Sequence, residues 1–171
     1  MKIRTTKLPG LLKIEREGFR DNRGIYVMNY SEREYRAHGI RVHFVEDDYS
    51  RSKKNVLRGI HADTKAWKLI SCPVGEIYVV IVNCDTKSKF FGKWAACTLS
   101  GDNHIQLLVP PKHGVSHLVR SDTAVFLYKQ SGYYDPKRQA TYCFDDPRFN
   151  IRWPIKNPIL SKRDRRGHYV T

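Results

Sequence analysis

The sequence has little of several features that mark whole classes of protein. None of its apolar runs approaches the ~20 residues that a membrane helix needs, and its first residues contain no apolar core of signal-peptide length. A glycine-rich phosphate loop and internal repeats are also missing. These absences argue against membrane proteins, secreted proteins, P-loop or Rossmann nucleotide-binding proteins and repeat proteins. We therefore expect a cytoplasmic protein with no membrane partner.

Cysteine is scarce, and its spacing fits neither a disulfide framework nor a zinc site. The four cysteines, Cys72, Cys84, Cys97 and Cys143, form no Cys-x-x-Cys pair. Three of them lie in apolar stretches, where cysteine is usually a small buried hydrophobe. The sequence therefore suggests no disulfide and no structural metal.

Negative charge is scarce as well. Lys and Arg number 31 against 17 Asp and Glu, which gives a formal net charge of +14. Such an excess favours an anionic partner. The positive charge is spread along the chain, however, and only residues 162–166 resemble a basic patch. We expect a small phosphorylated ligand and no nucleic acid, with a basic β-domain that binds nucleic acid as an alternative.

Short segments with strand character are abundant. The length suits one domain over residues 1–171, and turn signals recur at intervals of ~8–12 residues, which is typical of an all-β sandwich or barrel. The segment 77–82 is almost continuously apolar and β-branched, so it is predicted to be a strand buried on both faces. The expected strands cover residues 25–30, 42–47, 56–62, 67–73, 76–84, 92–99, 104–109, 116–118 and 123–129.

One short helix and a packed C-terminal segment complete the expected structure. Ser31, with Glu34 three residues later, fits a helix-capping box, and Gly39 is a usual helix stop, so a helix is predicted over 31–37. The segment 145–161 is rich in turn residues but also contains apolar residues. These indicate that the C-terminal segment packs back on the body of the protein.

The candidate chemistry begins with a histidine between two cations. Arg58, His61 and Lys68 lie within one stretch, on segments predicted to be strands. A titratable imidazole between fixed positive charges suits acid–base chemistry on an anion. Taken alone, a single histidine on a strand is more often structural or exposed than catalytic.

Several separated strings together resemble the dTDP-4-dehydrorhamnose 3,5-epimerase family of nucleotide-sugar enzymes. The resemblance covers about residues 15 to 165. It implies an all-β, cupin-type jelly-roll sandwich with short peripheral helices, usually a homodimer, that needs no metal or redox cofactor. The strings occur in order at residues 19–24 (FRDNRG), 52–61 (SKKNVLRGIH), 67–69 (WKL), 126–129 (FLYK) with 133–134 (YY), 145–146 (DD) with 151–154 (IRWP), and 160–164 (LSKRD).

The family chemistry gives each matching residue an expected role. Family members act on a nucleoside-diphosphate 4-keto-6-deoxy sugar, for bacterial surface polysaccharide synthesis. The ketone acidifies the hydrogens on C3 and C5, a base removes one, and a proton returns to the enolate from the opposite face. His61 matches the catalytic base, Asp164 its partner, Tyr128 the acid, and Lys68 a cation near the enolate oxygen.

The same matching implies a set of substrate-binding residues. Arg58 and Arg23 match cations that contact phosphates, and Tyr133 matches an aromatic that stacks on the nucleotide base. Glu46 and Ser50 match positions that line the ligand, although Glu46 replaces a glutamine there. His117 completes the set of expected substrate-binding residues.

Departures from the family pattern leave the substrate open. Val79 and Met28 stand where acidic residues are common. Without a gap, Val115 occupies the position of a frequent family histidine, whereas a two-residue insertion would make His117 that histidine, which we prefer. These changes leave open whether C3 alone or both C3 and C5 are inverted.

The nucleotide and the reaction also have alternatives. The string at residues 58–63, together with His117, resembles the branch that acts on GDP-activated 4-keto heptoses in capsule synthesis, so dTDP and GDP both remain open. A 3,4-ketoisomerase and a non-catalytic cupin-type binding module are further alternatives. His113 and His117 could suggest a cupin metal site, but Asp63 stands where a second histidine is expected after His61, so we expect no metal.

Overall fold

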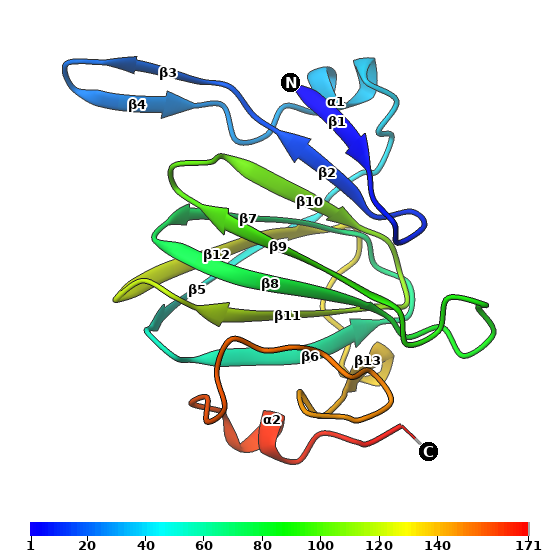
Figure 1. Ribbon diagram of the computed structural model, residues 1–171. Coiled ribbons are helices and arrows are strands. Elements are labelled where there is room, and N and C mark those ends of the chain that lie inside the picture. Colours follow the sequence, from blue (N-terminus) through cyan, green and yellow to red (C-terminus); the bar gives the residue numbers. More distant parts are fainter. Residues whose placement is uncertain (171) are drawn as a thin grey trace.

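Two antiparallel β-sheets face each other in the computed structural model, which describes residues 1–170 (Figure 1). The six-stranded sheet has the order β1 (Lys2–Thr5), β2 (Leu12–Glu15), β10 (Ile105–Val109), β7 (Lys68–Val74), β12 (Thr123–Gln130) and β5 (Glu46–Lys53). The five-stranded sheet has the order β13 (Gln139–Thr141), β6 (Leu57–Asp63), β11 (His113–Val119), β8 (Glu76–Asn83) and β9 (Trp94–Ser100). The predicted all-β sandwich is confirmed.

Strand β8 shows how the sequence pattern sets up the core. Successive side chains of a strand point to opposite faces. Ile77, Val79 and Ile81 lie in the core between the two sheets, while Val80 and Val82 pack in a second cluster on the outer face of their own sheet. The prediction of a strand buried on both faces is therefore confirmed.

The outer face of each sheet has its own cover. Helix α1 (Glu32–Ala37) lies over the six-stranded sheet, with Tyr35 buried. Its start and end follow the prediction, because Ser31 accepts a hydrogen bond from the Glu34 backbone and Gly39 has a φ of 84°. The C-terminal segment covers the five-stranded sheet, where Trp153 packs edge-on against Tyr78. The predicted packing of this segment is confirmed.

One predicted strand begins later than expected. The segment 42–45 lies outside the strands, and β5 starts only at Glu46. Val42 and Phe44 instead pack against the outer cluster of the six-stranded sheet. The alternation of apolar residues in this segment therefore reflects side chains that pack on the face of a sheet. It does not reflect a strand that is hydrogen-bonded within the sheet.

The remaining elements lie at the edges of the sandwich. They are β3 (Gly18–Asp21), β4 (Gly24–Val27), the 3₁₀ helix η1 (Pro136–Arg138) and α2 (Lys162–Arg165). Strands β3 and β4 pair only with each other and form a hairpin that projects from the body at the upper left of Figure 1. Within residues 1–170, none of the helices has the length and apolar character needed to cross a bilayer.

Candidate active site

A cavity of about 240 Å³ lies between the two sheets. Strands β5, β7 and β12 of the six-stranded sheet form one wall, and β6 and β11 of the five-stranded sheet form the other. Its lining combines cations, imidazoles, hydroxyls and a carboxylate with a few apolar groups. The lining residues are Asp48, Tyr49, Ser50, Arg58, His61, Lys68, Val115, His117, Phe126 and Tyr128.

His61 is held by a buried carboxylate. Its Nε2 lies 2.6 Å from Oδ1 of Asp164, whose side chain is only 3% exposed. Burial raises the pKa of Asp164, but hydrogen bonds from His61 and Ser161 outweigh it and hold the pKa below its usual value. Asp164 is thus a carboxylate at neutral pH. A carboxylate on Nε2 favours a hydrogen there and leaves Nδ1 free to accept a proton.

The C-terminal segment brings Asp164 to this position. Leu57 at the start of β6 donates its backbone N–H to the carbonyl of Ile159, which fixes the segment against the strand that carries His61. Ser161 then caps α2: its hydroxyl accepts the Asp164 N–H at 3.0 Å and donates to Oδ2 at 2.7 Å. Both oxygens of the Asp164 carboxylate are therefore engaged before any ligand arrives.

Tyr128 approaches the cavity from the opposite sheet. It is half-buried, and burial together with the nearby Asp48 carboxyl raises its pKa to about 12. Its hydroxyl is thus protonated at neutral pH. Lys68 lies beside it, with Nζ 5.5 Å from the centre of the Tyr128 ring. A base and a protonated hydroxyl consequently stand on opposite walls.

Two cations at the cavity have no carboxylate partner within residues 1–170. Arg58 donates from Nε to the hydroxyl of Ser52 at 3.0 Å, a neutral acceptor that leaves its charge uncompensated. Lys68 is largely buried, and this burial lowers its pKa. Uncompensated cations in a partly dry cavity favour an anionic ligand or a developing negative charge.

His117 is neutral and lies deep in the site. Burial, reinforced by the positive charges of Arg58 and His61, lowers its pKa to about 3. Its ring stacks on Phe126 with centroids 4.2 Å apart. A bulge between Val115 and His117 shifts the pairing of β11 with β6, and both side chains line the cavity.

Three buried polar atoms in the cavity have no hydrogen-bond partner within the described chain. They are Oδ2 of Asp48, Oγ of Ser50 and Nε2 of His117. A buried polar atom without a partner is costly, and native proteins keep few of them. Their concentration around one cavity favours a polar ligand that supplies the missing bonds.

The two histidines considered for a metal site have different surroundings. His113 contacts the carbonyl of Pro111 through Nδ1, 3.0 Å away, whereas His117 stacks on Phe126. Among residues 1–170, no three His, Cys, Asp or Glu side chains are grouped in an arrangement that could hold a metal ion.

Three residues expected to bind substrate lie outside the cavity lining. Arg23, at the turn of the β3–β4 hairpin, is 84% exposed and pairs with Asp21. Tyr133 is 71% exposed in the loop after β12. Glu46 lies next to the cavity, where its carboxylate is bonded by Gln130. The seven other expected residues are brought together: six line the cavity and Asp164 supports one of them.

Sequence reasoning missed Asp48. It lies two residues from Glu46 and two from Ser50, so strand alternation places all three on one face of β5. The signal was therefore present in the spacing, once the strand was known to start at Glu46. An acidic residue in a row with two expected ligand positions would have identified it.

Comparisons with known proteins show the family to which the chain belongs. A family model described as dTDP-4-dehydrorhamnose 3,5-epimerase matches residues 5–171. The dTDP-4-dehydrorhamnose 3,5-epimerase of Shigella flexneri is 36% identical over 171 residues, which cover 98% of this chain and 94% of the relative.

Solved structures extend the similarity to the fold. A dTDP-6-deoxy-D-glucose-3,5-epimerase from Legionella pneumophila Philadelphia 1, in complex with dTDP-4-keto-L-rhamnose, has a TM-score of 0.92 at 33% identity and covers 98% of this chain and 92% of its own. A dTDP-4-dehydrorhamnose 3,5-epimerase from Bacillus anthracis str. Ames, with TDP and PPi bound, has a TM-score of 0.93 at 31% identity and covers 99% of both chains. The expected cupin-type sandwich is thereby confirmed.

Proposed function

The chain belongs to the dTDP-4-dehydrorhamnose 3,5-epimerase family, and we propose that it inverts C3, C5 or both in the sugar of a dTDP-linked 4-keto-6-deoxy sugar. As a member of this family it is an epimerase, an enzyme of the isomerase class. One observation carries the proposal for this chain. The His61–Asp164 pair stands on one wall of the cavity and the protonated Tyr128 on the other.

The first half of the reaction is proton abstraction by His61. The C4 ketone acidifies the hydrogen on the neighbouring carbon, and the free Nδ1 of His61 accepts it. The resulting imidazolium is stabilised by the Asp164 carboxylate at 2.6 Å from Nε2, which also fixes the orientation of the ring. The C–H electrons move into an enolate whose negative charge lies on the former ketone oxygen.

The second half is proton return from the opposite wall. The charge of Lys68 is already in place in the partly buried cavity, so it stabilises the enolate oxygen without reorganisation. Tyr128 gives its hydroxyl proton to the carbon on the face away from His61, which inverts the configuration. The raised pKa of Tyr128 keeps that proton in place until the enolate forms.

The size of the cavity favours the sugar as its occupant. At about 240 Å³ it is smaller than the ~300–1,000 Å³ typical of pockets for drug-sized ligands. The diphosphate and nucleoside would therefore extend outward past the exposed Arg58. Ser50 and His117 offer a buried hydroxyl and a buried imidazole nitrogen to sugar oxygens.

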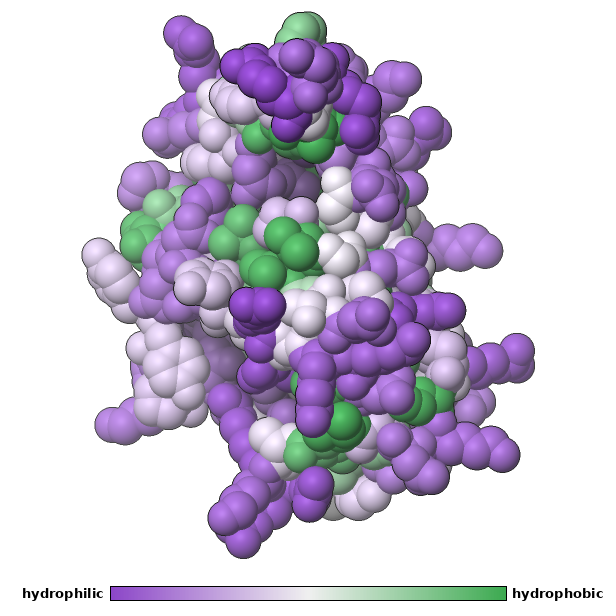
Figure 2. Space-filling view, turned by 90° about the vertical axis from the view of Figure 1, so that its left-hand side faces the viewer, coloured by the Kyte–Doolittle hydropathy of each residue, from purple (hydrophilic) through white to green (hydrophobic). Residues whose placement is uncertain are grey.

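A second copy of the chain would account for the position of Arg23. The hairpin that carries it projects toward the viewer at the top of Figure 2. Phe19 and Tyr26 are paired across this hairpin and are 69% and 70% exposed. Exposed aromatic pairs on a projecting element are typical of an interface. We propose that the hairpin packs on a partner subunit and delivers Arg23 to the partner's phosphate site.

Disrupting the hairpin tests the homodimer. Replacing both Phe19 and Tyr26 by Asp is expected to give a monomer in sedimentation measurements, since two charges would be desolvated at the interface. The exposed Tyr49→Asp variant, on β5, serves as the control that keeps the assembly. A wild-type chain that sediments as a monomer would refute the dimer and leave Arg23 without a role.

The reaction itself is tested by NMR in deuterated water. With a dTDP-4-keto-6-deoxy-glucose substrate, the wild-type protein is expected to place deuterium at C3 or C5 while the carbonyl stays at C4. His61→Asn is expected to lower the exchange rate by at least about 10³-fold, because the base is lost. The matched control is His43→Asn, at an exposed histidine outside the cavity.

Each of the other possible results of this NMR experiment would indicate an alternative function or an alternative base. A product with its carbonyl at C3 would indicate a 3,4-ketoisomerase. Binding of the nucleotide sugar without deuterium incorporation would indicate a binding module. If deuterium exchange occurs only with a GDP-linked 4-keto heptose, the substrate of this protein is that of the GDP-heptose branch of the family. Normal exchange in His61→Asn would show that a different group is the base.

A further inference from the structure

The Asp164 carboxylate is engaged by two side chains, and the mechanism above uses only one of them. Oδ1 lies 2.6 Å from Nε2 of His61, and Oδ2 accepts the hydroxyl hydrogen of Ser161 at 2.7 Å. The Asp164 side chain is almost completely buried. The direction in which this carboxylate faces therefore depends on protein groups, and Ser161 is one of them.

The hydroxyl of Ser161 is fixed at both its oxygen and its hydrogen. A serine hydroxyl has one hydrogen to donate and two lone pairs that accept. One lone pair accepts the backbone N–H of Asp164 at 3.0 Å, and the hydrogen goes to Oδ2 of the same residue. A carboxylate group turns about its last torsion with little intrinsic preference. With Oδ2 held by Ser161, this torsion is restricted and Oδ1 is directed at His61.

The segment that carries Ser161 is tied to neighbouring strands at both of its ends. Before it, the backbone N–H of Leu57, at the start of β6, donates to the carbonyl of Ile159 at 3.0 Å. After it, Arg163 donates from Nε to the hydroxyl of Thr141 at 2.9 Å, and Thr141 ends β13, which pairs with β6. The fold therefore fixes Ser161 relative to the strand of the catalytic base.

We propose that Ser161 is a positioning residue for the base, which holds Oδ2 of Asp164 so that Oδ1 faces His61 and which draws part of the carboxylate charge away from the imidazole. The proposal rests on the proposed epimerase function and adds a residue to its base side. Without the hydroxyl, the carboxylate turns more freely and its charge is concentrated on the oxygen that faces His61. The imidazolium is then stabilised too strongly, so the base is protonated at a higher pH.

The test uses variants that leave every charge around the His61–Asp164 pair in place. The charged or titratable side chains that line the cavity or lie on α2, apart from this pair, are Asp48 on β5, Arg58 on β6, Lys68 on β7, His117 on β11, Tyr128 and Tyr49 on the opposite sheet, and Lys162, Arg163 and Arg165 on α2. Strand β13 has none. Replacing the neutral Ser161 by another neutral residue therefore reports the hydrogen bond itself.

The first variant is Ser161→Gly, which removes the hydroxyl but keeps a tolerated residue at the start of α2, so it is expected to fold. Rates with dTDP-4-keto-6-deoxy-glucose are measured by NMR in deuterated water from about pH 5 to about pH 9. We expect kcat to fall about 10- to 100-fold, the equivalent of one hydrogen bond to a charged group. The acid-side midpoint of kcat/KM, which reports the base of the free enzyme, is expected to rise by about half a pH unit.

Two further variants separate the hydroxyl from the position of the helix. Ser161→Thr keeps a hydroxyl at an exposed residue with room for a methyl group, so it is expected to restore both kcat and the midpoint. Thr141→Val removes the hydroxyl that accepts from Arg163 on α2 and touches neither oxygen of Asp164. It is the matched control and is expected to keep the wild-type midpoint.

Three results would overturn the proposal. Ser161→Gly with the wild-type kcat and midpoint would show that the bond to Oδ2 has no role in the reaction. A loss of kcat without a change of midpoint, matched by Thr141→Val, would show that Ser161 only holds α2 in place. A Ser161→Thr variant as impaired as Ser161→Gly would show that the hydroxyl is not the group that matters. A wild type that incorporates no deuterium would instead overturn the epimerase function, and that result is read before any variant is compared.

Discussion

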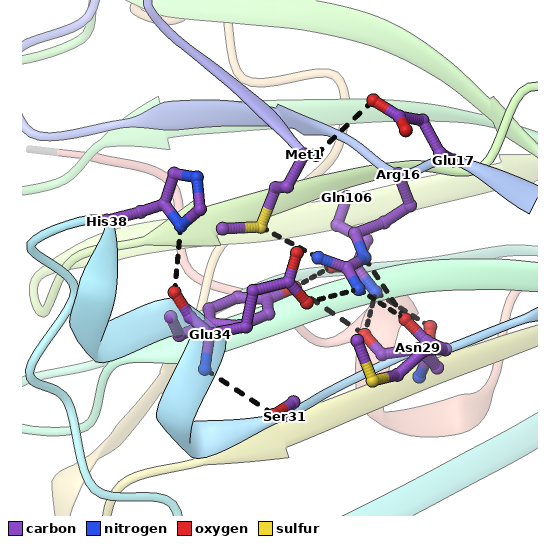
Figure 3. Close-up of polar contacts among 10 residues, drawn as sticks. Met1, Arg16, Glu17, Asn29, Ser31, Glu34, His38 and Gln106 are labelled. Atoms are coloured by element: carbon purple, nitrogen blue, oxygen red, sulfur yellow. Dashed lines mark hydrogen bonds and ion pairs between the residues drawn. The ribbon is translucent and has the colours of Figure 1, made fainter.

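Two regions of the molecule hold polar side chains that are removed from water: the lining of the cavity, and a cluster of side chains around Arg16. The two regions differ in their hydrogen bonding. The Arg16 cluster lies where α1 meets the six-stranded sheet. Figure 3 shows its residues gathered together, with dashed lines marking the hydrogen bonds and ion pairs among them. The cavity instead holds several buried polar atoms that have no partner in the described chain. The first arrangement is complete without a ligand, and the second is not.

The Arg16 cluster is satisfied by its own members. The Arg16 guanidinium donates to the carbonyl of Met28 at 2.7 Å and to the Glu34 carboxylate at 2.9 Å. Gln106 donates to both the backbone carbonyl and the side chain of Asn29 and accepts from the Tyr35 hydroxyl. A satisfied buried network of this kind stabilises the fold and leaves nothing to recognise a ligand.

The cavity contains both kinds of group side by side. Asp164 uses both carboxylate oxygens, on His61 and Ser161, and so is prepared before substrate binds. Asp48, on the opposite wall, leaves one oxygen without a partner. The proposed base side is thus assembled in the free protein. The unpartnered polar atoms that remain for a ligand lie on β5 and β11.

Breaking the Arg16 cluster is expected to have the larger effect, on stability alone. Arg16→Ala leaves the Met28 carbonyl and the partly exposed Glu34 carboxylate without their donor, and leaving such partners unsatisfied costs about 1–3 kcal/mol. The free energy of unfolding in urea measures this loss. The rate of deuterium incorporation per folded molecule is expected to stay at the wild-type value.

Arg36→Ala is the matched control for this substitution. Arg36 pairs with Glu32 on the surface of the same helix, with both side chains about half exposed, so the loss is expected to be about 0–1 kcal/mol. Equal losses for the two arginines would show that burial of the Arg16 network contributes nothing. A loss of catalytic rate in Arg16→Ala at low temperature, where the variant is folded, would contradict the separation of the two clusters.

The fold was accessible from the sequence where a local pattern and the final packing agree. The alternation in β8 and the cap at Ser31 are two such cases. The pattern misled at Val42 and Phe44, because apolar residues on alternate positions can cover a sheet as well as belong to one. The Arg16 cluster could not be foreseen, since Gln106 and its partner Asn29 are 77 residues apart in sequence.

The candidate site could not be predicted from residue spacing in the sequence alone, for the same reason. His61 and Asp164 are 103 residues apart, and Tyr128 comes from the opposite sheet, so only the resemblance to a family could group them in advance. Their proposed roles are still predictions. Asp48 could have been found from its spacing along β5, but its unpartnered oxygen appears only in the packed structure.

Two serines, whose hydroxyl oxygens differ in hydrogen bonding, give the smallest expected effects. Ser50 has an unpartnered Oγ in the cavity, so Ser50→Ala removes no hydrogen bond of the free protein and is expected to change the free energy of unfolding by less than about 0.5 kcal/mol. Its KM for the nucleotide sugar is expected to rise about fivefold, which corresponds to one lost hydrogen bond of about 1 kcal/mol. Ser116 donates to the carbonyl of Arg58 at 2.8 Å and is fully buried, so Ser116→Ala is expected to cost about 1–2 kcal/mol of stability. If Ser50→Ala destabilised the protein as much as Ser116→Ala and left KM unchanged, an unpartnered polar atom in this cavity would not be a mark of substrate contact.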